Sequence, residues 1–278
     1  MSRCRICDDF ETILSVKVML TTIVILTLTS AFKIKNRTLV IPDVHVPFHC
    51  REAEKKIHAL IKKHKPGKII FLGDVADLHA LTVHRQNPRW QDRLEIELEE
   101  THNYLARVRK VAGIKCEIIY IKGNHEDRWD RMVQSRLPAM RSIGWSLPQQ
   151  LRLKEIDVEW IYDAGQKPVR IKAGGGSKVR FMHGHEIKGG SAFPARHALK
   201  MATLLGENLI IGHTHRFGVM GFTLPRGSGD YYACELGLVA DKNRAGMRYA
   251  YPNTNWVKYV ALFDAKADNC SLPTFIKV

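Results

Sequence analysis

Cysteine is scarce in this sequence, and its spacing is irregular. The 278 residues include six cysteines without the regular spacing of a disulfide framework, which argues against a small secreted scaffold. Low-complexity segments, coiled-coil bias and repeats of solenoid length are also missing, so fibrous and repeat architectures are excluded. Cysteines that stay reduced are typical of a cytoplasmic protein, and we expect that location.

The sequence also has little that resembles a membrane span. Residues 18–32 form an uncharged, mostly apolar run of fifteen residues, which is short of the about 20 that cross a bilayer as a helix. The run suits a signal-peptide core, a buried segment, or part of an upstream extension if the native start is Met19 or later. We divide the chain into an N-terminal extension, residues 1–32 (signal, anchor or upstream extension), and one domain, residues 33–278. Membrane contact or export through residues 18–32 is the alternative to a cytoplasmic location.

Acidic residues are few relative to basic ones. Asp and Glu number 28 against 43 Lys and Arg, a formal net charge of +15 at pH 7. A positive surplus raises the local concentration of polyanions and speeds their capture. This favours a nucleic acid or another phosphorylated substrate, although a basic soluble protein without such a substrate is the alternative.

The first half of the domain alternates between strands and helices. Apolar runs at residues 38–41, 68–72 and 116–121 predict buried strands, and residues 51–64 and 92–111 carry apolar side chains at helical spacing. Strands that alternate with helices are typical of right-handed crossovers in a parallel sheet. We therefore expect a parallel sheet here.

The second half has a different pattern. Residues 127–141 and 194–205 look helical, while strands are expected within residues 156–183, at 208–211 and within 217–263. These strands suggest a second, more antiparallel sheet packed on the first. The domain is expected to be an α/β fold.

Five polar clusters each follow one of the apolar strands. They are Asp43-Val44-His45, Gly73-Asp74-Val75-Ala76-Asp77, Gly123-Asn124-His125-Glu126, His183-Gly184-His185 and Gly212-His213-Thr214-His215. Because ligands of α/β proteins bind outside the carboxyl ends of the strands, we expect these side chains to converge.

The chemistry of these clusters points to metal ions. Carboxylates, imidazoles and one amide, without a thiolate, form a donor set suited to divalent ions such as Mn, Fe or Zn. The set is larger than one catalytic ion needs and suits two ions that share a carboxylate. Two such ions can activate water and stabilise both oxygens of an in-line displacement, which is phosphoryl chemistry.

The ordered motifs, from Asp43 to His215, resemble those of the calcineurin-like metallophosphoesterase superfamily. The combination is specific and spans most of the chain. The resemblance implies a four-layer α/β/β/α sandwich of two mixed sheets flanked by helices. It implies two divalent metal ions, with Mn expected first and Fe, Zn or Ni as alternatives, and a hydroxide that bridges them as the nucleophile.

The resemblance also assigns roles to individual residues. The first ion would be bound by Asp43, His45, Asp74 and His215. The second would be bound by Asp74, Asn124, His183 and His213, with Asp74 bridging.

Two further residues take catalytic roles in the resemblance. His125 would face the phosphate and help to protonate the leaving oxygen, and Asp77 would orient its imidazole. His185 is expected either to orient a metal ligand or to contact substrate.

The sequence departs from the protein Ser/Thr phosphatase branch, which carries Arg-Gly after its second motif. Leu78-His79 stands there instead, so the arginine that clamps phosphate in that branch is missing. Arginines are frequent further along the chain, interleaved with Trp129 and Trp145, and form either a strand-gripping surface or a solvated amphipathic helix with core tryptophans. These arginines are Arg128, Arg131, Arg136, Arg141 and Arg152.

Three functions follow from these observations. The first is a metal-dependent phosphodiesterase or nuclease, with DNA or RNA as the candidate substrate. The second is a phosphomonoesterase that acts on small molecules or phosphoproteins. The third is a scaffold that uses the fold only for binding, which the complete ligand set disfavours. The oligomeric state stays open.

Overall fold

The computed structural model describes residues 37–82, 93–137, 139, 145–172, 177–224, 229–244, 246–247, 255–264 and 272–278. The helices are α2 (Arg51–His64), η1 (His79–Leu81), α3 (Leu94–Ala112), α4 (Asp127–Arg136), α5 (Leu147–Gln150) and α6 (Arg196–Leu205). The strands are β1 (Arg37–Ile41), β2 (Lys68–Phe71), β3 (Glu117–Ile121), β4 (Val158–Ile161), β5 (Val169–Lys172), β6 (Lys178–Met182), β7 (Asn208–Ile211), β8 (Phe217–Thr223), β9 (Asp230–Leu236), β10 (Tyr259–Asp264) and β11 (Thr274–Lys277). The N-terminal extension, residues 1–32, lies outside the described residues.

The described strands form two mixed sheets. The first has the order β11-β10-β1-β2-β3-β4, with β1 to β4 parallel and with β10 antiparallel to both β1 and β11. The second has the order β5-β6-β7-β9-β8, with parallel pairs in the middle and antiparallel pairs at both edges. Each of the five strands that a polar motif follows has a parallel neighbour.

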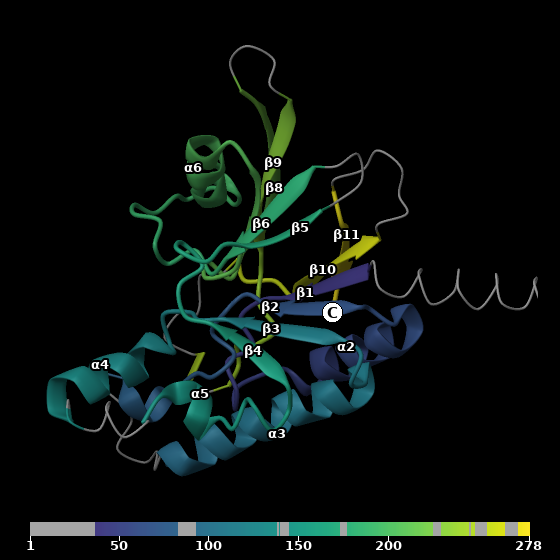
Figure 1. Ribbon diagram of the computed structural model, residues 1–278. Coiled ribbons are helices and arrows are strands. Elements are labelled where there is room, and N and C mark those ends of the chain that lie inside the picture. Colours follow the sequence, from purple (N-terminus) through teal and green to yellow (C-terminus); the bar gives the residue numbers. More distant parts are fainter. Residues whose placement is uncertain are drawn as a thin grey trace, which may run out of the picture.

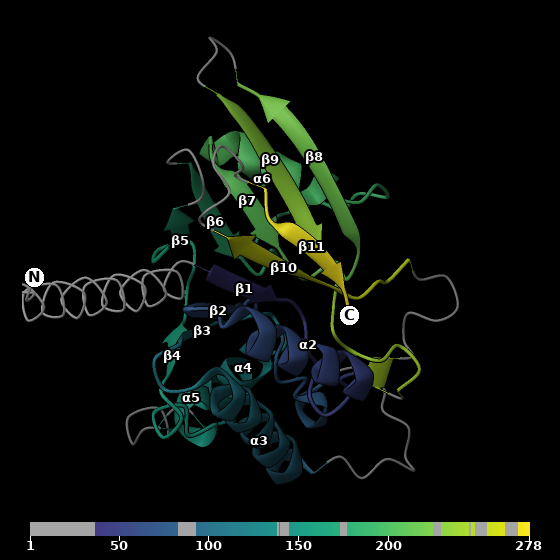
Figure 2. The same ribbon diagram turned by 90° about the vertical axis from the view of Figure 1, so that its right-hand side faces the viewer.

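The layers follow the order helix, sheet, sheet, helix. Helices α2 and α3 cover the outer face of the first sheet, and α6 covers the outer face of the second (Figure 1). Turning the molecule shows the long strands β8 and β9 standing above the first sheet (Figure 2). The expected four-layer α/β/β/α sandwich is therefore confirmed.

The alternation of side chains along a strand explains why the first sheet is buried on both faces. In β1, Leu39 and Ile41 pack toward the helices, whereas Val40 packs toward the second sheet. A strand covered on both sides has no polar face, so its sequence is a continuous apolar run. Helix α2 contributes Ala53, Ile57 and other apolar residues at helical spacing to the same layer.

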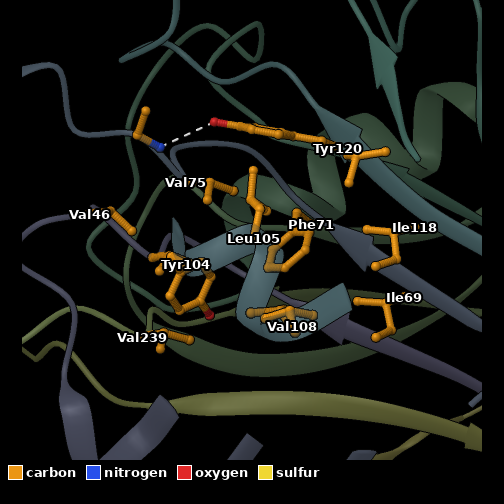
Figure 3. Close-up of a cluster of buried hydrophobic side chains, with 14 of the residues drawn as sticks. Val46, Ile69, Phe71, Val75, Tyr104, Leu105, Val108, Ile118, Tyr120 and Val239 are labelled. Atoms are coloured by element: carbon orange, nitrogen blue, oxygen red, sulfur yellow. Dashed lines mark hydrogen bonds between the residues drawn. The ribbon is translucent and has the colours of Figure 1, made fainter. Parts of the chain in front are cut away.

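Large aromatic side chains fill the space between the first sheet and α3. Phe71 of β2, Tyr104 of α3 and Tyr120 of β3 are fully buried there (Figure 3). The hydroxyl of Tyr120 accepts a hydrogen bond from the backbone N–H of Ala76 at 3.1 Å. This layer of the core thus reaches the loop after β2, which carries the second polar motif.

Two strands expected in the second sheet, β4 and β10, belong to the first, and β11, which lies beyond the strands predicted from the sequence, joins them there. Strand β4 pairs parallel with β3, and β10 pairs antiparallel with β1, so β4, β10 and β11 extend the first sheet. Apolar runs that are buried on both faces look alike in sequence, and only long-range pairing decides which sheet takes them.

Helix α4 is shorter than expected. It ends at Arg136, and Leu137 has left the helical conformation with φ −139°. Pro138 follows in the sequence, and the residue before a proline is driven out of the helical region by a steric clash.

Among the described residues, none of the helices has the length and apolar character needed to cross a membrane. The apolar run at residues 18–32 lies outside the described residues, so its role stays a prediction.

Candidate metal centre

The five polar motifs leave the carboxyl ends of β1, β2 and β3 in the first sheet and of β6 and β7 in the second. All of these strands lie in the parallel portions of their sheets. The two sheets pack face to face, so the loops of both open at a common place. This is the crevice where α/β proteins bind ligands.

The first group of ligand atoms comes from three of these loops. Asp43, His45, Asp74 and His215 each offer one atom, and these atoms lie within 4.8 Å of one another. The Nε2 atoms of His45 and His215 are 3.0 Å apart, and Nε2 of His215 lies 3.4 Å from Oδ1 of Asp43. Two imidazole nitrogens that face each other beside two carboxylates form a site for a divalent cation.

The second group shares one carboxylate with the first. Asp74, His183 and His213 again offer atoms within 4.8 Å of one another. Oδ1 of Asn124 lies 2.9 Å from Nε2 of His183 and 2.8 Å from Nδ1 of His213. The structure therefore brings together all seven residues that the resemblance assigns to metal binding, in two adjoining groups that meet at Asp74.

Asp77 contacts two histidines. Its Oδ2 lies 2.8 Å from Nδ1 of His45 and 3.4 Å from Nδ1 of His125. The backbone carbonyl of Asp77 lies 2.9 Å from the same Nδ1 of His125. Asp77 thus lies against His125, as the sequence analysis expects, but its carboxylate is closer to His45. By holding Nδ1 of His45, it leaves Nε2 of that ring turned toward the metal centre.

Burial and charge together prepare the centre for cations. Burial raises the pKa of Asp74, but the neighbouring His183 and His125 outweigh this effect and hold it well below its usual value. Burial, followed by the charge of His183, lowers the pKa of His213 to about 3. Burial and the charge of His125 also lower the pKa of His45. Ionised Asp74 and neutral His213 and His45 are the protonation states that metal ligation requires. Burial lowers the pKa of His183, but Asp74 outweighs burial and raises it to about 10, so this ligand must lose a proton when an ion binds.

The backbone of the ligand loops is unusual. Five of the seven expected ligands have positive φ, from 29° at Asp43 to 63° at His213; the others are His45, Asp74 and His215. Residues with a Cβ rarely adopt this conformation, and such positions concentrate at functional sites because the surrounding structure must hold them. The loops turn sharply after each strand, and these turns bring the side chains to one point.

Glu126 is a buried residue of the site to which the sequence analysis gave no role. Its Oε2 accepts hydrogen bonds from the backbone N–H groups of Asp74 at 3.0 Å and Gly123 at 2.7 Å. Its Oε1 accepts from the N–H of Ala76 at 3.1 Å and the hydroxyl of Tyr120 at 2.5 Å. One carboxylate therefore ties the loop after β2 to the loop after β3. In the sequence, the only indication of this role is that Glu126 directly follows His125 in the third motif.

Glu235 has a comparable place in the second sheet, and the sequence analysis missed it. This buried residue of β9 accepts hydrogen bonds from Oγ1 of Thr214 at 2.7 Å and lies 3.0 Å from Nη2 of Arg216. Thr214 and Arg216 flank His215, so the contacts of Glu235 fix the loop that carries this expected ligand. A carboxylate between Cys234 and Leu236, near the buried end of the strand, was the signal that could have found it.

His185 belongs to neither ligand group. Its ring centroid lies 5.4 Å from that of His183, and its Nε2 lies 3.8 Å from Oδ2 of Asp127. Burial lowers its pKa. Both expectations, orienting a ligand or contacting substrate, stay predictions.

The sequence left two interpretations of the arginines and tryptophans, a strand-gripping surface or a solvated amphipathic helix with core tryptophans. Trp129 is buried, and its Nε1 donates to the carbonyl of Trp145 at 3.0 Å, so it is a core residue. Arg152 forms an ion pair with Glu99 of α3 at 2.7 Å, and Arg141 lies outside the described residues.

Arg128 lies against the catalytic motif. Its Nη1 donates to the carbonyl of Asp77 at 2.9 Å, and its Nη2 lies 3.2 Å from Nε2 of His125. A guanidinium is therefore present beside His125, although the arginine that follows the second motif in the phosphatase branch is missing.

A comparison of the sequence with family models identifies the family of this chain. A sequence model of the family described as calcineurin-like phosphoesterase matches residues 36–234, a span that contains all five motifs. The chain belongs to this family. Membership supports hydrolysis of phosphate esters, and the two ligand groups are candidate metal sites. No curated protein matches the sequence.

Several solved structures are similar to this chain. A Vps29 complexed with zinc from Entamoeba histolytica has 16% identity and a TM-score of 0.41, and the match covers 87% of this chain and 98% of that one. Yfce, a phosphoesterase from E. coli, has 14% identity and a TM-score of 0.37, with 87% and 99% covered. The nuclease MPE from Pseudomonas putida has 14% identity and a TM-score of 0.38, with 81% and 84% covered. At these values the likenesses carry no argument about activity.

Proposed function

We propose that this protein is a two-metal phosphodiesterase that cleaves a nucleic acid, with phosphomonoester hydrolysis as the alternative. The observation that carries the proposal is the sharing of Asp74 by two groups of ligand atoms, each confined within 4.8 Å. A carboxylate common to two sites is what a pair of divalent ions acting on one phosphate requires.

The residues fit two ions. One would be held by Asp43, His45, Asp74 and His215, and the other by Asp74, Asn124, His183 and His213. Two divalent ions, of which Mn²⁺ is the first candidate, would activate water and stabilise the attacking and leaving oxygens when bound. Oxygen and nitrogen donors without a thiolate suit Mn²⁺, and Fe, Zn or Ni are alternatives.

His125 would act as the proton donor. Burial lowers its pKa, but the carboxylates of Asp74 and Asp77 outweigh burial and raise it to about 9. The carbonyl of Asp77 accepts from Nδ1, so the ring presents Nε2 to the centre, 3.8 Å from Oδ2 of Asp74. An imidazolium there stabilises negative charge on the phosphate and can hand its Nε2 proton to the leaving oxygen.

Two features support a nucleic acid over a phosphoprotein. The net charge of +15 favours polyanions. Leu78-His79 replaces the Arg-Gly of the protein phosphatase branch, and the guanidinium near His125 comes instead from Arg128 of α4.

The test compares substrates on the Mn²⁺-loaded chain. Bis-p-nitrophenyl phosphate, p-nitrophenyl phosphate, and single- and double-stranded DNA are offered in parallel. We expect diester turnover at least equal to monoester turnover, together with cleavage of DNA. Strong monoesterase activity without diester or DNA turnover would favour the phosphomonoesterase, and no turnover of any ester would favour a binding scaffold.

We also propose a cytoplasmic location, on the basis of the thiols. Cys50, Cys116 and Cys234 are free, and burial raises the pKa of Cys116 to about 11. Free thiols are typical of a reducing compartment.

A further inference from the structure

One face of α4 is lined with arginines and borders a pocket. Arg128, Arg131, Met132, Ser135 and Arg136 recur at intervals of three and one along the helix, so they share one face. They line a pocket of about 670 Å³ together with η1 and the residues next to it. The opposite face of α4 carries Trp129 and Val133 into the core. We name the set Arg128, Arg131 and Arg136 the α4 arginine face.

The pocket is continuous with the metal centre. Asn124 lines it, and Oδ1 of the same residue contacts His183 and His213 at 2.9 and 2.8 Å. Nη2 of Arg131 donates to the backbone carbonyl of Asn124 at 3.3 Å. A substrate whose reacting phosphate lies at the metal centre therefore reaches the α4 arginine face directly.

Two of the three charges on this face are unopposed among the described residues, because only Arg128 pairs with a carboxylate, Oδ1 of Asp77 at 3.5 Å. Within the described part of the chain, the residues that line the pocket include no carboxylate. The acids of α4, Asp127 and Asp130, lie 2.6 and 3.1 Å from Nζ of Lys122 instead. Arg131 and Arg136 are exposed, and within the described part of the chain no ion pair engages either of them. Three guanidinium groups thus face a pocket that has no acid on its described wall.

We propose that the α4 arginine face binds the non-reacting phosphates of a single nucleic-acid strand, next to the phosphodiester held at the metal centre. The proposal rests on the proposed function and names the substrate that this centre accepts. From Arg128 to Arg136 the helix axis advances about 12 Å, several times the ~3.4 Å of axis per charge in one strand of a duplex, so the face is long enough for more than one phosphate of an extended single strand. Among the described residues that line the pocket none is aromatic, so these residues offer contacts to phosphates and none that stack on bases.

The test removes charge from the part of the face that lies away from the reacting atoms. The variant is Arg131→Gln/Arg136→Gln, which leaves Arg128 and every expected metal ligand in place. The matched control is Lys56→Gln/Lys63→Gln, which removes the same charge from exposed positions on α2. Binding of a fluorescent oligothymidylate of about 12 nucleotides is measured by anisotropy in EDTA, where no metal-dependent turnover occurs. Turnover of bis-p-nitrophenyl phosphate is measured with Mn²⁺.

We expect Arg131→Gln/Arg136→Gln to bind the oligonucleotide about tenfold more weakly at low salt, and the control to bind within about twofold of the wild type. Loss of two phosphate contacts makes the slope of log K against log salt shallower by about 1.4 for a single strand. Turnover of bis-p-nitrophenyl phosphate, which has one phosphate only, is expected to stay within about twofold of the wild type in Arg136→Gln alone, which leaves the hydrogen bond from Arg131 to Asn124 intact.

Equal oligonucleotide affinity and an equal salt slope in the wild type and the arginine variant would overturn the proposal. Inorganic triphosphate that binds more tightly than the oligonucleotide would also overturn it, in favour of a small polyphosphate. If the wild type hydrolyses monoesters only, the diesterase proposal fails, whereas the anisotropy comparison still decides the role of the α4 arginine face.

Discussion

Nε2 of His183 lies 3.2 Å from Oδ2 of Asp74, although the two residues follow strands of different sheets. His183 is held from the other side, because its Nδ1 lies 2.8 Å from the carbonyl of Leu72 in the loop that carries Asp74. The contact therefore joins the two sheets at the metal centre. It makes Asp74 the residue on which both expected metal sites depend.

Asp74→Asn should abolish binding of both ions. The substitution keeps the shape of the side chain but removes the charge that the two sites share. We expect the Mn²⁺ content, measured by elemental analysis after gel filtration, to fall to background. Phosphoesterase activity should fall on the order of 10³-fold, equivalent to several kcal/mol of transition-state stabilisation. Asp163→Asn, in a loop before β5, is the control and should keep both ions; a full Mn²⁺ complement in Asp74→Asn would contradict the shared-carboxylate assignment.

His125→Ala should separate metal binding from catalysis. The backbone N–H of His125 donates to Oδ1 of Asp74 at 2.9 Å, and alanine keeps this hydrogen bond. We therefore expect the Mn²⁺ content to be unchanged while kcat for bis-p-nitrophenyl phosphate falls about 10²- to 10⁴-fold, the usual contribution of a general acid. Loss of metal from this variant would show that His125 is a ligand and not the proton donor.

Gly212→Ala should damage the first metal site through packing alone. A Cβ at Gly212 would overlap the carboxylate of Asp43, which must then shift from its place beside His215. We expect the affinity for Mn²⁺, measured by isothermal titration calorimetry, to fall by about tenfold or more, a range typical of changes that disturb ligand orientation.

Gly190→Ala is the matched control for this substitution, since an added Cβ there meets no described atom within 4 Å. Its Mn²⁺ affinity should equal that of the wild type. Equal affinities in both alanine variants would mean that the position of Asp43 does not limit binding.

Glu54→Gln should destabilise the fold in a pH-dependent way. Oε1 of Glu54 accepts from Nε of Arg107 at 2.7 Å, and its Oε2 lies 3.1 Å from Nε2 of His49, so it connects α2 to α3. Burial raises its pKa, but the hydrogen bonds from His49 and Arg107 outweigh burial and lower it to about 2. At pH 7 we expect the substitution to lower the free energy of unfolding by about 1–3 kcal/mol.

The sign of the pH effect follows from the lowered pKa. A carboxylate with a depressed pKa in the folded state stabilises the protein above its unfolded pKa of about 4.5, and this contribution is lost as pH falls toward about 2. The difference between wild type and Glu54→Gln in urea unfolding should therefore shrink across that window. Glu52→Gln, on the same helix in an exposed ion pair with Lys55, should change the free energy by less than about 0.5 kcal/mol at any pH. A free-energy difference between wild type and Glu54→Gln that does not change with pH would contradict this explanation.

Much of the local structure could be predicted from the sequence. The ranges expected for β1, β2 and α2 agree with the structure to within about one residue. Apolar periodicity and the proline and glycine residues that end an element are local signals, so they predict local structure well. The motifs at the strand ends could also be read directly, since the residue types that bind metals differ from those that build a core. Fold and family were both confirmed on this basis.

Strand pairing could not be predicted in the same way. Strand β10 pairs with β1, so Arg37 lies opposite Asp264 at the far end of the chain. An apolar run covered on both faces can join either sheet, and the choice depends on contacts far away in the sequence. The contacts of Asp77 with both His45 and His125 likewise depend on packing between segments that are far apart in the sequence.

The sequence by itself determined which groups this protein offers to a phosphate ester, because the residue types and their places after apolar strands are local properties. Only the tertiary structure decided that Glu126 holds two ligand loops together and that three arginines of α4 line a pocket with Asn124. Both arrangements depend on how separate segments pack against one another, and no local pattern encodes the distance between two loops.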